Sequence, residues 1–239
     1  MPEAIKTVWL DNPPVNAVSQ AVTDHLWAEL EDLGEARVVV LRGRGERAFS
    51  AGADITGFGG LAEGDRPAGI TPLAEMMESL PVPVVAAIHG YCLGGGLEIA
   101  LGCDVRIATR DAQFGFPEVK LGLLPGGGGT QRTPRLVGEG HAKWLIMSGE
   151  RIPAEQALAW GLVEAVVDDL DAGIEQFAGT LAKQSPHAVR EIKQLLAATR
   201  ERPDYEQEFR AFAACLQSDD GQEGVAAFLE KREARWTGR

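Results

Sequence analysis

The sequence predicts an α/β body followed by an all-helical C-terminal tail. Signals for short strands and for helices alternate through most of the chain, and helical periodicity dominates after residue 131. The 239 residues include 29 glycines, so many positions suit tight turns between such elements. We place the boundary where a new helix begins, which gives a body over residues 1–184 and a helical region over residues 185–239.

The body is expected to repeat the order strand, turn, helix. Short β-like runs are predicted at residues 5–10, 37–41, 84–88, 105–108, 112–114 and 162–167. Ser19 can cap a helix whose apolar face carries Val22, Leu26 and Leu30. A further helix is expected around residues 73–80, where the sequence PVP ends it.

The tail is predicted to be helical throughout. Ser185 and Pro186 form a helix-start signal, and Ser218 can cap a last helix. Both helices carry apolar residues at helical spacing: Val189, Ile192 and Leu196 in the first, and Val225, Phe228 and Leu229 in the second. Such stripes are typical of a core or of a subunit interface.

Charge and cysteine usage argue against several classes of protein. The net charge is −12, and the basic residues are dispersed among acids, so a nucleic-acid partner is not expected. Cys92, Cys103 and Cys215 show no CxxC spacing, so we expect three buried thiols rather than a zinc site or a disulfide. Residues 1–14 lack the basic and apolar regions of a signal peptide, and no apolar run approaches the roughly 20 residues of a membrane span. We therefore expect a cytoplasmic protein with no membrane partner.

Residues 90–98, GYCLGGGLE, place three adjacent glycines and an ionisable group at the start of a helix expected over residues 97–102. Unpaired N–H groups and the positive end of the helix dipole meet there, so the place stabilises negative charge. A phosphate-binding loop would need Lys followed by Ser or Thr after the glycines, where this chain has Leu97 and Glu98. A dinucleotide fingerprint is not provided by residues 57–62 or 126–131.

The remaining ligand is a developing oxyanion on a carbonyl, with Glu98 as the neighbouring acid or base. On this stretch alone, glycines that only allow close packing are an equally good interpretation. Two further stretches favour the chemical one. AFSAGADI at residues 48–55 offers backbone N–H groups in a turn after a strand, and FGFPEVKLGLLPGGGG at residues 114–129 supplies a second carboxylate, Glu118, directly after Pro117.

Five motifs in this order resemble those of the crotonase (enoyl-CoA hydratase/isomerase) family: NPPVNAVS, AFSAGADI, GYCLGGGLEIALGCD, FGFPEVKLGLLPGGGGTQR and FLEKR. The resemblance extends over nearly the whole chain. It implies a crotonase-like spiral of ββα units with an α-helical C-terminal region that forms trimers, which often pair into hexamers. We therefore expect a homotrimer or a dimer of trimers.

The resemblance also implies roles for single residues. Ala51 and Gly95 match the two backbone donors of the oxyanion hole, which bind the thioester carbonyl of an acyl-CoA. Glu98 and Glu118 match the acid/base pair of the hydratases. Seven further residues match or adjoin positions that bind the substrate or border the catalytic water: Ala17, Ala53, Asp54, Ile55, Pro117, Gly126 and Lys231.

The expected reaction is the syn addition of water to a 2-trans-enoyl-CoA, which gives a 3-hydroxyacyl-CoA. Such hydration needs an oxyanion hole, a base for water and an acid for Cα, and two N–H donors with two carboxylates supply these. We assign Glu98 chiefly to water activation and Glu118 chiefly to proton delivery. No metal or redox cofactor is expected, because coenzyme A is part of the substrate.

Three alternatives remain open at this stage. A 3,2-enoyl-CoA isomerase would use the same oxyanion hole with one carboxylate. A serine hydrolase would use Ser50 in an AxSxG-like turn, but GADITGFGG is a poor helix former where that mechanism needs a helix. A non-catalytic protein with the same fold would not need both glutamates.

The chain departs from the family pattern in two places. One strand precedes NPPVN where relatives commonly have a hairpin, so the first turn of the spiral is expected to be incomplete. Thr56 and Gly57 stand where many hydratases carry Lys-Glu. The loop from Gly57 to Gly69 is expected to shape the acyl site.

Overall fold

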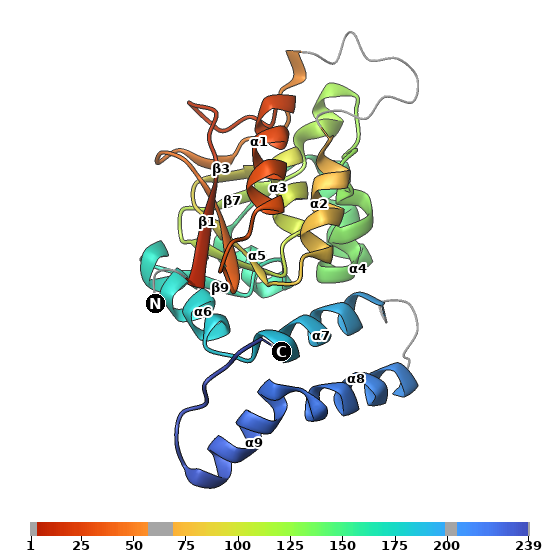
Figure 1. Ribbon diagram of the computed structural model, residues 1–239. Coiled ribbons are helices and arrows are strands. Elements are labelled where there is room, and N and C mark those ends of the chain that lie inside the picture. The colour runs from red at the N-terminus through yellow and green to blue at the C-terminus, as the bar shows by residue number, and fades with distance from the viewer. Residues whose placement is uncertain (1–3, 57–68, 199–204, 239) are drawn as a thin grey trace.

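The computed structural model describes residues 4–56, 69–198 and 205–238, which form an α/β body and a three-helix tail (Figure 1). The expected loop at residues 57–69 lies outside the described residues except for Gly69. The tail helices are α7 (Pro186–Ala198), α8 (Tyr205–Gln217) and α9 (Asp219–Glu230). In Figure 1 they lie together below the body.

A five-stranded parallel sheet forms the centre of the body, in the order β1-β2-β4-β6-β9. Its strands are β1 (Ile5–Leu10), β2 (Val38–Gly43), β4 (Val84–Ile88), β6 (Val105–Thr109) and β9 (Ala165–Val167). Every residue of β4 is buried, as expected for a parallel strand that is covered on both faces. The uninterrupted apolar run VVAAI is the sequence pattern of such a strand.

A smaller sheet lies beside the first, in the order β3-β5-β7-β8. Its strands are β3 (Ala48–Ser50), β5 (Tyr91–Leu93), β7 (Gln113–Gly115) and β8 (Arg151–Pro153), and only the last pair is antiparallel. Each of β2, β4 and β6 is followed by a strand of the small sheet and then by a helix. The chain is therefore a spiral of ββα units, which confirms the predicted fold class.

Among the described residues, the first turn of the spiral is incomplete, as expected from the single strand predicted before NPPVN. Strand β1 is followed directly by α1 (Gln20–Glu31), whose N-cap Ser19 accepts a hydrogen bond from the backbone N–H of Val22. An isolated parallel bridge between Val18 and Ala53 stands where a second strand would pair. This bridge fixes the turn that follows β3.

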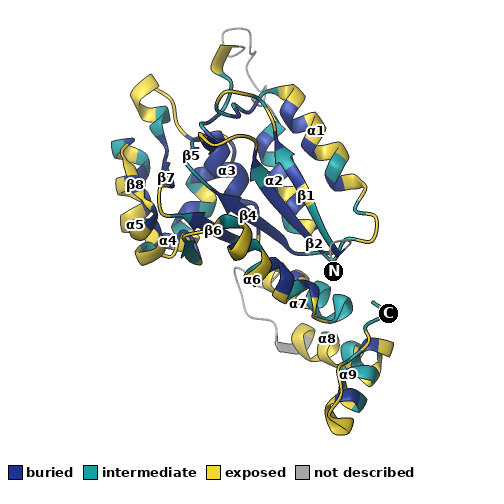
Figure 2. Cartoon of the chain, turned by 90° about the vertical axis from the view of Figure 1, so that its left-hand side faces the viewer, coloured by how far each residue is buried: buried dark blue, intermediate teal, exposed yellow. Residues whose placement is uncertain are grey.

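Helices cover both faces of the large sheet (Figure 2). One face packs on α1, α2 (Ile70–Ser79) and α3 (Gly95–Leu101), and it contributes the alternate residues Val39 and Leu41 to the main core. The other face contributes Val38 and Val40 to a second apolar cluster, which α6 (Leu170–Ala182) covers. The alternation of buried residues along β2 thus builds two cores from one strand.

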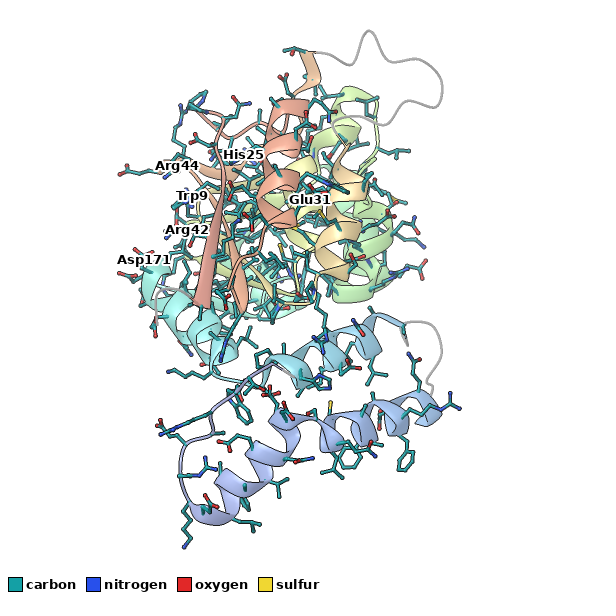
Figure 3. All side chains as sticks on the ribbon, viewed as in Figure 1. Trp9, His25, Glu31, Arg42, Arg44 and Asp171 are labelled. Atoms are coloured by element: carbon teal, nitrogen blue, oxygen red, sulfur yellow. The ribbon has the colours of Figure 1, made fainter. Side chains whose placement is uncertain are left out.

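A cluster of one tryptophan and several charged side chains lies at the carboxyl ends of β1 and β2 (Figure 3). The guanidinium groups of Arg42 and Arg44 lie 5.1 and 4.1 Å from the ring centroid of Trp9, within cation–π range. Arg42 also forms an ion pair of 2.6 Å with Asp171 in the first turn of α6, and Arg44 one of 3.2 Å with Asp11. The cluster joins α6 to the edge of the sheet.

Several predicted elements begin or end at other residues. Helix α2 begins at Ile70 rather than near residue 73, and β7 begins one residue later than expected. Helix α3 begins at Gly95, so two of the three adjacent glycines are helical, with Gly94 as N-cap. Of the three cysteines, Cys215 is only half-buried, because it lies on α8 of the tail rather than in the body core.

Helix α7 is attached to the body by an ion pair between a buried lysine and a partly exposed aspartate. The ammonium group of Lys193 lies 2.7 Å from a carboxylate oxygen of Asp104 and donates to the carbonyl oxygens of Met77 and Val82. The same Asp104 oxygen accepts the backbone N–H of Val84 at 2.8 Å. The ammonium group is thus satisfied although Lys193 is only 9% exposed.

Candidate active site

The structure contains a cavity of about 490 Å³ that is lined by most of the expected site residues. Its lining comes from the turn after β3, the start of α2, the start of α3, the 3₁₀ helix η4 (Pro117–Leu121) and the loop before α4 (Gly129–Ser148). The lining residues are Ala51, Gly52, Ala53, Ile55, Ile70, Gly94, Gly95, Glu98, Pro117, Glu118, Leu121, Leu123, Leu124, Gly126 and Gly127. Both carboxylates and all candidate backbone donors therefore border one space.

Glu98 lies in the first turn of α3 and is 2% exposed. Its Oε1 accepts the backbone N–H groups of Gly127 at 2.7 Å and Gly129 at 2.8 Å. Burial raises the pKa of Glu98, and the two N–H donors together with the positive charge of Arg132 oppose that rise. The two donors fix one carboxylate oxygen and favour the ionised form, so the other oxygen can accept a proton.

Glu118 lies in the first turn of η4, immediately after Pro117. Burial raises its pKa to about 7, and the neighbouring charge of Glu98 adds to the rise. Its Oε2 is buried without a hydrogen-bond partner. Its Oε1 lies 2.7 Å from the point that a Cβ on Gly94 would occupy, so that glycine leaves room for the carboxyl group. Glu118 can therefore hold a proton close to neutral pH.

Two backbone N–H groups at the cavity are available to a ligand, those of Ala53 and Gly95. No hydrogen bond among the described residues engages either of them. The bridge between Val18 and Ala53 uses the carbonyl of Gly52 and the N–H of Asp54, so the N–H of Ala53 itself points away from Val18. The N–H of Ala53 lies beside Gly95, 3.2 Å from the point that a Cβ on Gly95 would occupy.

This geometry corrects the assignment of Ala51 as an oxyanion donor. The N–H of Ala51 donates to the carbonyl of Val15 at 2.9 Å, so it is not available to a ligand. The residue two positions later in the same turn, Ala53, has the free N–H instead. Peptide N–H groups in such a turn point in different directions, and which one faces the cavity depends on the pairing with residues 15–18.

Gly95 is required by packing as well as by its N–H group. A Cβ at this position would lie 2.7 Å from Cδ1 of Ile70 and 3.2 Å from the backbone nitrogen of Ala53. Ile70 is 3% exposed and also fills the space that a side chain on Gly127 would need. The glycines therefore allow close approach of α3, the turn after β3 and Ile70, and the N–H of Gly95 remains available at the cavity.

Four of the expected binding residues line the cavity: Ala53, Ile55, Pro117 and Gly126. Three do not. Ala17 precedes Val18 of the bridge, and Asp54 turns its carboxylate toward the N–H and hydroxyl of Thr56. Lys231 ends α9, which packs on α7 and α8 at the opposite end of the molecule from the start of α2 (Figure 1).

The structure does not support a serine nucleophile at Ser50. Its side chain is fully buried, and its hydroxyl donates to the carbonyl of Asn16 at 2.7 Å. The described residues after Ser50 form an extended turn that pairs with Val18 rather than an α-helix. Ser50 therefore positions the turn from inside the fold.

Several residues at the site were not predicted from the sequence. Ile70 and three leucines, Leu121, Leu123 and Leu124, form the apolar part of the lining. The leucines are 46–69% exposed although they are large and apolar, which is typical of a ligand-binding surface. The run LGLL at residues 121–124 could have predicted this surface, because leucines in a short loop between helices are not needed for the core.

Fold and site together define a protein of the crotonase type, with a ββα spiral, two available N–H groups, and one buried and one half-buried glutamate at one cavity. The chain belongs to the enoyl-CoA hydratase/isomerase family, whose family model matches residues 1–239. It is 41% identical to the short-chain-enoyl-CoA hydratase of Clostridium acetobutylicum, over 88% of this chain and 84% of that protein.

Two other relatives show the range of proteins that the chain resembles. It is 35% identical to the carnitinyl-CoA dehydratase of Salmonella heidelberg, over 98% of this chain and 95% of that protein. The crystal structure of the enoyl-CoA hydratase from Bacillus anthracis superimposes with a TM-score of 0.92 at 38% identity, covering 99% of this chain and 96% of that one. The chain is thus a family member along its whole length, and its family acts on acyl-CoA thioesters.

The described residues contain no helix that is long and apolar enough to cross a membrane. Within the same part of the chain, no three His, Cys, Asp or Glu side chains are grouped so that they could hold a metal ion.

Proposed function

We propose that the chain is an enoyl-CoA hydratase that adds water in the syn sense to 2-trans-enoyl-CoA thioesters. The observation that carries the proposal is the difference between the two carboxyl groups. Burial raises the pKa of both groups, but two N–H donors and the charge of Arg132 oppose the rise at Glu98, whereas the pKa of Glu118 is raised to about 7. Glu98 is therefore the better suited of the two to act as the base, and Glu118 to act as the acid.

The thioester oxygen accepts the N–H groups of Gly95 and Ala53, which stabilise the negative charge that forms on it. Each well-placed donor of this kind contributes on the order of 3 kcal/mol to the transition state. The acyl chain lies against Ile70 and the leucines of the 121–124 loop. Coenzyme A enters and leaves as part of the substrate, and the mechanism uses no resident cofactor.

The two carboxyl groups account for both proton transfers of the proposed reaction. Glu98 takes a proton from water through its free Oε2, and the water oxygen forms the bond to C3. Electrons move from the C2–C3 double bond onto the thioester oxygen. Glu118 then gives its proton to C2 as the carbonyl re-forms, and proton exchange with solvent restores both groups. Because the carboxyl groups interact, their apparent pKa values belong to the pair.

The proposal is tested by incubating the protein with crotonyl-CoA and following the loss of the enoyl absorbance. A product identified as 3-hydroxybutyryl-CoA supports hydration. A parallel reaction with a 3-enoyl-CoA measures isomerisation. Turnover of the 3-enoyl substrate alone, with crotonyl-CoA untouched, would show that the chain is an isomerase instead.

We also propose that the protein is a homotrimer or a dimer of trimers, from the exposed apolar face of its tail. Six apolar tail residues are 50–83% exposed: Phe209, Phe212, Leu216, Val225, Phe228 and Leu229. So much exposed apolar surface on two neighbouring helices, α8 and α9, is typical of a protein interface. Lys231 could reach coenzyme A only at the cavity of a neighbouring copy, because its own tail lies away from its own cavity.

A further inference from the structure

An ion pair between Arg132 and Glu78 lies next to the loop of residues 126–129, whose N–H groups bind Glu98. Arg132 in α4 and Glu78 in α2 are 54 positions apart in the sequence, and their side chains are only 11% and 19% exposed. The arginine binds the carboxylate through two atoms, with Nε at 3.0 Å from Oε1 and Nη2 at 3.4 Å from Oε2. This bidentate ion pair fixes the plane of the guanidinium group.

The same guanidinium group shapes the loop of residues 126–129. Its Nη1 donates to the carbonyl of Gly127 at 3.2 Å, while the N–H of Gly127 donates to Oε1 of Glu98 at 2.7 Å. Gly128 has a φ of 108°, and the space that a side chain would take there is occupied by the guanidinium of Arg132. The loop therefore lies directly on Arg132, and one glycine is held from both sides.

Arg132 and Glu78 do not border the substrate cavity. They line a second cavity of about 620 Å³ between the body and α7, whereas Gly127 lines the first. The pair is thus placed to act on Glu98 through the loop, without contact to substrate. Arg132 also acts through its charge, which lowers the pKa of Glu98 against the effect of burial. Glu118, the other titratable group facing Glu98, is negative when ionised and acts in the opposite direction.

We propose that Arg132, held in place by Glu78, is a positioning residue that fixes Gly127 and thereby the orientation of the Glu98 carboxylate for water activation. This inference rests on the proposed hydratase function. It means that loss of the Arg132–Glu78 pair should lower turnover and not only stability. An arginine is suited to the task, because three of its nitrogens make separate contacts with fixed directions.

The test compares Arg132→Met, Arg132→Lys and Glu78→Gln with the control Arg135→Gln, an exposed arginine one turn further along α4. Arg132→Met should lower kcat about 10- to 100-fold with KM changed less than about 3-fold, as expected when a reacting group is misplaced by a fraction of an ångström. Arg132→Lys should recover only part of kcat, because a lysine retains the positive charge but cannot contact Glu78 and Gly127 with three separate nitrogens. The control should match the unchanged protein.

The pH dependence gives a readout that a merely structural role would not move. Glu98 must be ionised to accept a proton, so the acidic limb of kcat reports its pKa. Arg132→Met removes a positive charge and should move this limb to higher pH. Glu78→Gln leaves the guanidinium without its counter-charge and should move the limb to lower pH. Shifts of opposite sign support the proposal.

The two proposals fail in different ways. The pKa of Glu98 can also be followed by NMR of ¹³C-carboxyl-labelled glutamate, assigned with Glu98→Gln, and this titration needs no turnover. If the protein does not hydrate crotonyl-CoA, the proposed function fails while the titration still tests the charge effect. If all variants only lower the melting temperature, with kcat, pH profile and Glu98 titration unchanged in the folded state, the pair is structural and the inference is overturned.

Discussion

Gly127 donates its backbone N–H to Oε1 of Glu98 at 2.7 Å, across 29 positions of sequence. Together with the donor from Gly129, this bond leaves Oε2 as the atom of Glu98 that is free for chemistry. The loop before α4 therefore holds the carboxylate that we propose as the base, although it contributes no side chain to the site. Gly127 in this loop has to be a glycine, because a side chain there would collide with both Glu98 and Ile70.

Glu98→Gln should lower hydration turnover at least 10²-fold, because the amide cannot take a proton from water. The amide oxygen can still accept the N–H groups of Gly127 and Gly129, so the fold should be retained. Turnover of crotonyl-CoA and the melting temperature are measured on the same preparation. Near-normal turnover in this variant would remove Glu98 from the role of base.

The second carboxyl group should set the basic limb of the pH profile. Glu118 must carry a proton to deliver it, and its pKa is raised to about 7, so kcat should fall as the pH rises through about 7. Glu118→Gln should lower turnover at least 10²-fold and abolish this limb. A basic limb that persists unchanged in Glu118→Gln must come from another group.

The same carboxyl group should cost stability at neutral pH. The pKa of Glu118 is raised from 4.5 to about 7, so the folded state binds its proton more tightly than the unfolded state. Stability is then unaffected below about pH 4.5 and decreases as the pH rises to about 7. Glu118→Gln should therefore unfold at a higher temperature than the unchanged protein at pH 8, by about 1–2 kcal/mol in unfolding free energy, and the difference should vanish at pH 4.

Substitution of Gly95 should separate packing from catalysis when Ile70 is changed as well. Gly95→Ala puts a methyl group 2.7 Å from Cδ1 of Ile70, so the variant should lose both stability and turnover. Ile70→Val removes that terminal methyl group. The double variant should regain its melting temperature. If its turnover returns in full, packing alone explains the need for a glycine at position 95. A persistent loss of turnover would show that a side chain there also displaces the thioester from the N–H donors.

The interface proposal predicts that a charge on the tail dissociates the protein. Phe212→Glu places a carboxylate in the exposed apolar face of α8 and should shift the mass measured by light scattering from a trimer or hexamer to a monomer. Gln222→Glu, at an exposed polar position on α9, adds the same charge as a control and should not. A strictly monomeric unchanged protein at micromolar concentration would contradict the proposal.

Local patterns in the sequence predict most of the fold. The run VVAAI predicts buried strand β4, and Ser19 with its spaced apolar residues predicts α1, because burial and capping leave a direct trace in neighbouring residues. The glycines of α3 were expected before the helix rather than inside it. Their place in the helix follows from contacts with Ile70 and Ser50, which lie more than 20 positions earlier.

The site was predictable in its side chains and less so in its backbone. Glu98 and Glu118 stand in recognisable motifs and border one cavity as expected. The N–H of Ala51, which the motif suggests as a donor, is engaged by Val15, and the available N–H lies two residues later, because the direction of each N–H is set by the pairing of that turn with Val15 and Val18. The Arg132–Glu78 pair leaves no local pattern, because its members come from different helices.

The two N–H groups at Ala53 and Gly95 belong to the main chain, and every residue type except proline carries such a group. Point mutation therefore cannot delete this part of the site by changing side-chain chemistry, whereas one base change in a codon can replace either glutamate. In the proposed mechanism, the groups that activate the thioester are therefore resistant to substitution, and the groups that transfer protons are easily replaced. A laboratory that seeks a new reaction on acyl-CoA should leave the two turns untouched and vary positions 98, 118 and 70 instead.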